Sequence, residues 1–233
     1  MREQRFLVDN IPAVLYGGEC GKCCLFVHGK NGCKEEALPF AELAVPAGWQ
    51  VLGVDLPEHG ERKAEQGTFN PWTAVPELQS VIAFIKSRWK RRALRATSIG
   101  AWFSMLAADS AAFERAAFVS PVVNMQNLIE RMMQWAGVSA DDLQKQGEIP
   151  TAFGETLSWR YYVYAREQSI TDWTIPTAIL CGERDELIPQ TDFKAFTDRF
   201  GAELTVAPAA EHWFHTAEQL TVLSRWESFI FSF

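Results

Sequence analysis

The sequence predicts an α/β protein in which strands and helices alternate about a largely parallel sheet. Short apolar runs alternate with segments of helical periodicity through most of the 233 residues, a pattern typical of one α/β sheet rather than of two separate folds. Hydrophobic residues make up 48 % of the chain and charged residues 22 %, which excludes disordered, collagen-like and coiled-coil proteins. Neither an internal repeat nor a low-complexity segment interrupts the pattern. We therefore expect a single domain that spans residues 1–233.

The expected elements follow in chain order. Apolar runs on either side of Asp9 and Asn10 indicate an amino-terminal hairpin. Spacings of three and four residues between apolar side chains predict a helix over residues 73–90. The same criteria predict strands at 23–27, 50–54, 93–97, 116–119, 177–180 and 204–206, and further helices at 34–45, 100–110, 193–200 and 216–231.

Residues 121–175, between the strands expected at 116–119 and 177–180, break this alternation. The segment holds roughly 40 residues more than a single helical crossover needs. Large apolar side chains fall at helical spacing from Met125 to Met133, and a series of tryptophans and tyrosines follows. We interpret the segment as a helical cap over a site. An extra pair of helices packed on the domain is the plainer interpretation, and the two are compatible.

Charge and targeting signals narrow the range of partners. The net charge of −7 and the pI of about 5.2 argue against nucleic acid, whose phosphates need a basic surface. No apolar run reaches the ~18 residues of a membrane helix, and MREQRFLVDN lacks the apolar centre of a signal peptide. We expect a cytoplasmic protein with a small-molecule substrate and no membrane partner. The oligomeric state stays open, with a homodimer among the alternatives.

The five cysteines predict reduced thiols rather than a disulfide framework. Cys20 and Cys23 form a CxxC motif, with Cys24 beside it. A zinc site would need a second pair of ligands at suitable spacing, and only the distant Cys33 and Cys181 remain. We therefore interpret the cluster as part of a strand and its turn, and expect no metal.

Ser98 is the candidate nucleophile, because it lies where a predicted strand passes into a helix. A serine on such a tight turn presents its hydroxyl clear of the backbone. Small residues two positions before and after it, Ala96 and Gly100, let strand and helix pass closely. The amide of Ile99 then lies at a helix amino terminus, where it can stabilise a developing oxyanion.

The acid and the base follow Ser98 in chain order. Asp185 lies in the loop after the strand at 177–180, and His212 lies in the loop after the strand at 204–206. The order serine, aspartate, histidine is that of a hydrolase of this topology, in which histidine takes the serine proton and aspartate orients the imidazole. The amide of Lys30, just after the strand at 23–27, is the expected second oxyanion donor. Asp55 and Glu58 are rival acids, but Asp55 precedes the serine and belongs to a loop motif.

Five motifs together resemble the α/β-hydrolase superfamily along nearly the whole chain. They are LFVHGKNGCKEE at 25–36, VDLPEHGER at 54–62, ATSIGA at 96–101, GERDELIP at 182–189 and AAEHWF at 209–214. The match more narrowly resembles small bacterial esterase-like members with a helical insertion after the sixth strand. The resemblance implies a mostly parallel eight-stranded sheet flanked by helices and a cofactor-free Ser-His-Asp mechanism. His28 and His59 belong to the two H-G turns, where we expect their side chains to brace loops rather than to catalyse.

We expect a serine hydrolase that cleaves carboxylic esters through an acyl-enzyme, with thioesters and amides as further substrates. The methionines and tryptophans of the expected cap favour small to medium apolar acyl groups or aromatic esters. Acyl transfer to an alcohol or amine stays open, because the same acyl-enzyme serves both outcomes. The alternative is a catalytically inactive relative that binds a ligand or partner in the capped cleft.

Overall fold

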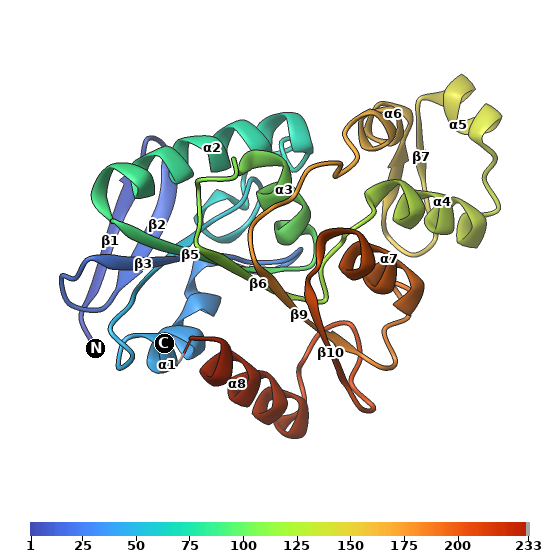
Figure 1. The fold of residues 1–233 in the computed structure, drawn as a ribbon. Coiled ribbons are helices and arrows are strands. Elements are labelled where there is room, and N and C mark those ends of the chain that lie inside the picture. The colour runs from blue at the N-terminus through green and yellow to red at the C-terminus, as the bar shows by residue number, and fades with distance from the viewer. Residues whose placement is uncertain (232–233) are drawn as a thin grey trace.

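A sheet of eight strands runs through the centre of the molecule, with helices on both of its faces (Figure 1). The computed structural model describes residues 1–231. Among these residues, no helix is long and apolar enough to cross a membrane.

The strands and helices agree closely with the predicted order, and the sequence-based boundaries differ by a few residues. The strands are β1 (Glu3–Val8), β2 (Ile11–Tyr16), β3 (Lys22–Val27), β4 (Gln50–Val54), β5 (Arg91–Thr97), β6 (Arg115–Val119), β7 (Glu148–Pro150), β8 (Thr156–Ser158), β9 (Thr177–Gly182) and β10 (Glu203–Ala207). The helices are α1 (Ala37–Ala44), α2 (Pro71–Arg88), α3 (Ile99–Ala107), α4 (Met125–Ala136), α5 (Ala140–Gln146), α6 (Trp159–Glu167), α7 (Gln190–Phe200) and α8 (Ala217–Phe231), with short 3₁₀ helices at Lys34–Glu36 and Gly60–Arg62.

The main sheet has the strand order β1-β2-β4-β3-β5-β6-β9-β10. The hairpin β1–β2 is antiparallel and joins β4 in antiparallel register, while every pair from β4 to β10 is parallel. In a parallel sheet the carboxyl ends of the strands share one edge, and loops at that edge build the sites of such folds. The predictions of a mostly parallel eight-stranded sheet and of the hairpin are confirmed.

Local sequence determines where several helices start and stop. The Asn70 side chain caps α2 by accepting a hydrogen bond from the Thr73 amide at 2.9 Å, and Pro71 occupies a first-turn position where a missing N–H costs nothing. Ser158 caps α6 in the same way. The α4 helix ends at Gly137, whose φ of 66° is a left-handed conformation that favours glycine.

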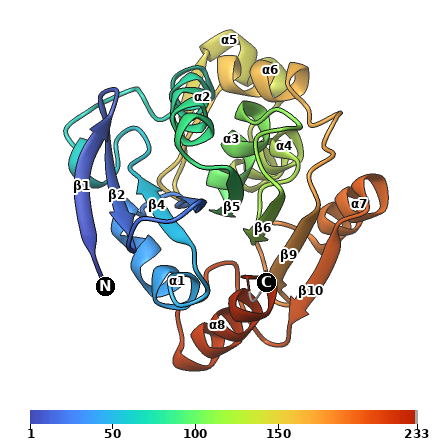
Figure 2. The same ribbon diagram turned by 60° about the vertical axis from the view of Figure 1, so that its left-hand side comes forward.

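Two apolar cores lie on opposite faces of the sheet. One packs α2, α3 and α7 against the sheet, and the other packs α1 and α8 (Figure 2). The adjacent residues Cys23 and Cys24 belong to different cores, because successive side chains of a strand point to opposite faces. Both thiols are buried, and burial raises the pKa of each. These two thiols are core residues of β3, as the interpretation as a strand predicted.

The segment between β6 and β9, residues 121–175, differs from the expected helical cap. It holds three helices, α4 to α6, and also the antiparallel two-stranded sheet β7–β8. Figure 1 shows these elements gathered together beyond one end of the main sheet. The sequence did not predict the β7–β8 hairpin because each of its strands has three residues. Three residues are too few to show an alternating pattern. We call residues 121–175 the insertion.

Candidate active site

Ser98 lies at a sharp turn between the central strand β5 and helix α3. Its φ of 50° and ψ of −123° are strained for a residue with a side chain, and such strain persists only where the surroundings enforce it. The Ser98 amide donates to the Val119 carbonyl at 3.0 Å. A Cβ at Gly100 would approach the His28 carbonyl oxygen to 2.2 Å. Only glycine therefore lets α3 start this close to the end of β3.

The structure brings Ser98, His212 and Asp185 together from three different strand ends. The distance from Ser98 Oγ to His212 Nε2 is 2.9 Å, and that from His212 Nδ1 to Asp185 Oδ2 is 2.8 Å. The Asp185 carboxylate is fully buried, while the imidazole is about one-tenth exposed. The arrangement can pass a proton from the hydroxyl to the imidazole while the carboxylate keeps the other ring nitrogen protonated.

The loops that carry Asp185 and His212 are held by hydrogen bonds to backbone amides and by close packing against each other. The second oxygen of Asp185 accepts hydrogen bonds from the amides of Leu187 at 3.0 Å and Ile188 at 2.8 Å, so the carboxylate has one orientation. A Cβ at Gly182, where β9 ends, would lie 2.3 Å from the Ala210 carbonyl oxygen. Glycine at this position therefore allows the histidine loop to pack against the aspartate loop.

The loop after β3 approaches the serine from the other side. A Cβ at Gly29 would lie 3.4 Å from the Ser98 Cβ. Within residues 1–231, the amides of Lys30 and Ile99 have no hydrogen-bond acceptor. The neighbouring amide of Asn31 is engaged, since it donates to His59 Nε2 at 2.9 Å. The two amides expected to bind an oxyanion are therefore both unused donors.

His28 and His59 hold these loops in place. The Leu56 amide donates to His28 Nε2 at 3.0 Å, and Nδ1 of His28 donates to the Gly29 carbonyl at 2.7 Å. Burial lowers the pKa of His28 to about 4. His59 holds its own turn through hydrogen bonds in the same way, since its Nδ1 donates to the Pro57 carbonyl at 2.7 Å. Both rings brace turns and neither bonds to Ser98.

Asp55, one of the two rival acids, belongs to a separate ion-pair network. Its buried carboxylate accepts from Lys34 Nζ at 2.8 Å, from the Lys34 amide at 2.8 Å and from the Glu61 amide at 3.0 Å. The bonds of Asp55 thus fix the 3₁₀ helix Lys34–Glu36, which precedes α1, and the turn after β4. His212 is oriented by Asp185, and Asp55 plays no part in that contact.

Sequence reasoning missed a contact between the insertion and the loop after β3. The Lys30 ammonium forms an ion pair with the Glu155 carboxylate. Glu155 lies in the turn between β7 and β8, where its backbone bonds to Thr151 in both directions. The two charged residues are 125 positions apart, so nothing local in the sequence signals the pair.

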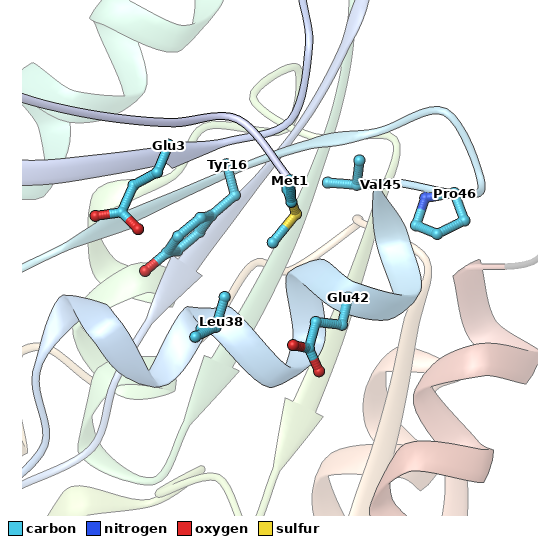
Figure 3. Close-up of a pocket in the computed structure, with 7 residues that line it drawn as sticks. All are labelled: Met1, Glu3, Tyr16, Leu38, Glu42, Val45 and Pro46. Atoms are coloured by element: carbon cyan, nitrogen blue, oxygen red, sulfur yellow. The ribbon is translucent and has the colours of Figure 1, made fainter.

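The structure also contains a shallow pocket away from these loops, with a volume of about 360 Å³. It lies between the β1–β2 hairpin and α1, and Figure 3 shows its lining residues Met1, Glu3, Tyr16, Leu38, Glu42, Val45 and Pro46. It shares no residue with the cluster of Ser98, His212 and Asp185. Among the described residues, no group of three histidine, cysteine or acidic side chains could hold a metal ion.

Comparisons with known proteins agree on the fold. No protein-family profile matches the sequence, and no curated protein matches it. Among solved structures, Est1E from Butyrivibrio proteoclasticus with ferulic acid bound superimposes with a TM-score of 0.79 at 19 % identity, covering 97 % of each chain.

Two further matches extend this result. An esterase from Pyrococcus furiosus gives a TM-score of 0.70 at 16 % identity, covering 98 % of this chain and 88 % of that one. A thioesterase domain from the curacin biosynthetic pathway gives 0.62 at 15 % identity, covering 97 % and 99 %. Identities this low establish a shared fold and leave the reaction to be argued from the site.

Proposed function

We propose that this chain, which has the α/β-hydrolase fold, is a serine hydrolase that cleaves carboxylic esters through an acyl-enzyme. One observation carries the proposal: a strained, loop-held serine hydroxyl lies 2.9 Å from an imidazole, which a buried carboxylate orients at 2.8 Å. A free serine hydroxyl is a weak nucleophile and needs such a base. The neighbouring solved structures, an esterase and a thioesterase domain among them, support hydrolysis as the reaction class.

The proposed reaction has two halves. Ser98 Oγ attacks the ester carbonyl carbon while His212 Nε2 takes the hydroxyl proton, and the amides of Lys30 and Ile99 donate to the oxyanion. Collapse of the tetrahedral intermediate breaks the bond to the alcohol oxygen, which receives the proton from His212. Water then attacks the acyl-enzyme with the same base, which releases the acid and restores the Ser98 hydroxyl. Asp185 stabilises the imidazolium in both halves.

Apolar or aromatic acyl groups are the proposed substrates. The insertion places a cluster of aromatic side chains near the start of α3, where Tyr161 and Tyr164 pack against Trp102. Est1E, which shares the fold, is known with ferulic acid bound, so esters of aromatic carboxylic acids belong in the first substrate panel. Thioesters belong there as well, because the curacin thioesterase domain has the same fold.

Intact-mass measurement after incubation with a fluorophosphonate tests the proposal. We expect one covalent adduct on the wild type and none on Ser98→Ala, together with a loss of ester hydrolysis of about 10⁴-fold or more. Ser104→Ala, which changes a serine of α3 that bonds to the Gly100 carbonyl, is the matched control and keeps the adduct. Equal labelling of Ser98→Ala and wild type would contradict the assignment. The absence of both adduct and hydrolysis in the wild type would favour a ligand-binding role.

A further inference from the structure

Helix α6 of the insertion carries three tyrosines, and the hydroxyls of Tyr161 and Tyr162 differ in their hydrogen bonding. The Tyr162 hydroxyl donates to Glu130 at 2.8 Å. The Tyr161 hydroxyl is buried, yet it has no hydrogen-bond partner within residues 1–231. A buried hydroxyl without a partner destabilises the folded protein, and native proteins rarely retain one without a reason. Phenylalanine would fill the same space without that cost.

Two indole rings hold the Tyr161 ring in place. It stacks on Trp102 with ring centroids 6.0 Å apart and an interplanar angle of 23°. It also meets Trp72 edge-on at 6.0 Å. Trp102 lies one turn beyond Ser98 in α3, and Trp72 lies in the first turn of α2. Both helices start at the carboxyl edge of the sheet, so Tyr161 is held at the edge where Ser98 lies.

Burial also determines the protonation state of the hydroxyl. It is the main cause that raises the pKa of Tyr161, and the neighbouring Tyr164 and Glu155 raise it further. The hydroxyl therefore stays protonated and able to donate. Glu155 pairs with Lys30, whose amide is a proposed oxyanion donor. The unused hydroxyl thus belongs to the same insertion that contacts the loop after β3 through Glu155.

We propose that the Tyr161 hydroxyl determines substrate specificity by hydrogen-bonding an oxygen at the end of the acyl group remote from the ester. The inference rests on the proposed ester hydrolysis and names the acyl class more closely: apolar along its length, with a terminal hydroxyl or ether oxygen. The bond would satisfy a group that the free protein leaves unpaired. Substrates without that oxygen would gain nothing from Tyr161.

The test compares Tyr161→Phe with Tyr164→Phe on matched ester pairs. Tyr164 is the control because its ring contacts the same two indoles. One pair is methyl hexanoate and methyl 6-hydroxyhexanoate, and the other is methyl cinnamate and its 4-hydroxy derivative. For at least one pair, we expect Tyr161→Phe to lower kcat/KM about tenfold for the oxygen-terminated ester alone. Tyr164→Phe should leave the ratio within each pair unchanged.

Stability gives a second, independent measurement. If the hydroxyl has no partner in the free protein, the Tm of Tyr161→Phe equals or exceeds that of the wild type. A clear drop in Tm would show an internal hydrogen bond and overturn the proposal. An unchanged ratio within both pairs in Tyr161→Phe would overturn it as well.

Binding to a Ser98→Ala protein separates this proposal from the proposed function. Thermal shifts of that protein with the same esters report the Tyr161 contact without any chemistry. One outcome is that the wild type hydrolyses no ester, while Ser98→Ala binds the oxygen-terminated esters better than their partners and Tyr161→Phe removes this preference. That outcome would contradict the hydrolase proposal alone. Hydrolysis without oxygen-dependent binding would contradict only the inference about Tyr161.

Discussion

Arg95 is a charged residue within the buried central strand, and the last helix supplies its counter-charge. Arg95 Nε lies 2.8 Å from Glu227 Oε1, and both side chains are about 5 % exposed. The guanidinium also lies over the Phe26 ring at 4.8 Å and donates to the Thr97 hydroxyl. Thr97 precedes Ser98, so this ion pair lies next to the turn that carries the proposed nucleophile.

Removing the Glu227 charge should therefore destabilise the protein strongly. We expect Glu227→Gln to lower the free energy of unfolding by about 3 kcal/mol, because a buried guanidinium loses its counter-ion. Urea denaturation measures the change. Glu114→Gln is the control, since Glu114 pairs with Arg91 at the surface and should cost less than about 1 kcal/mol. Equal effects of the two variants would refute a special role for the buried pair.

At the scale of elements, the insertion is tied to the loop after β3 by the pair of Lys30 and Glu155. Because the Lys30 amide is a proposed oxyanion donor, the pair would steady that donor. We expect Glu155→Gln to lower kcat about tenfold with little change in KM, less than the 10²–10³ lost when an oxyanion donor is removed outright. Steady-state kinetics on one ester measures both constants.

The charge-swapped double variant Lys30→Glu with Glu155→Lys keeps the amide and reverses the pair. It should recover most of the kcat that either single variant loses. Both side chains are more than one-third exposed, so added salt should lower the kcat of the wild type and leave that of Glu155→Gln unchanged. Unchanged kcat in both single variants would show that the pair does not position the loop.

Elements with strong periodicity were predictable from the sequence, and contacts across the chain were not. The strand–helix order and the loops that hold Ser98, Asp185 and His212 follow from local patterns, because each loop comes directly after an apolar strand. The partner of Arg95 lies 132 residues away, and no single sequence reveals such a pairing. The Tyr161 hydroxyl is buried and unpaired because its ring packs against Trp72 and Trp102, and only the three-dimensional structure shows this packing.

For the whole molecule, acid sensitivity should follow from His28. Burial lowers its pKa from 6.5 to about 4, so the folded protein keeps the ring neutral while the unfolded chain takes up a proton below pH 6.5. The stabilisation is complete above that pH and is lost as pH falls toward 4. From this group alone, we expect the free energy of unfolding to fall by about 3 kcal/mol.

Urea midpoints at pH values of about 7.5, 5.5 and 4 measure this dependence. His28→Gln should flatten it, and His215→Gln, which changes an exposed histidine, should not. NMR titration of the His28 ring checks the pKa directly if the variant folds poorly. A ring that titrates near 6.5 in the folded protein would refute the assignment.

The pairing of Arg95 with Glu227 also bears on how the chain matures during synthesis. Domains generally fold as units while the chain emerges from the ribosome. Here β5, which leads into Ser98, emerges long before the Glu227 carboxylate that neutralises the Arg95 guanidinium. The two residues are 132 positions apart. A nascent chain that lacks α8 would have to bury an unpaired charge in order to complete the sheet. The Ser98 turn should therefore reach its strained form only after α8 has been synthesised, so that the proposed site is absent from a nascent chain that ends before Glu227.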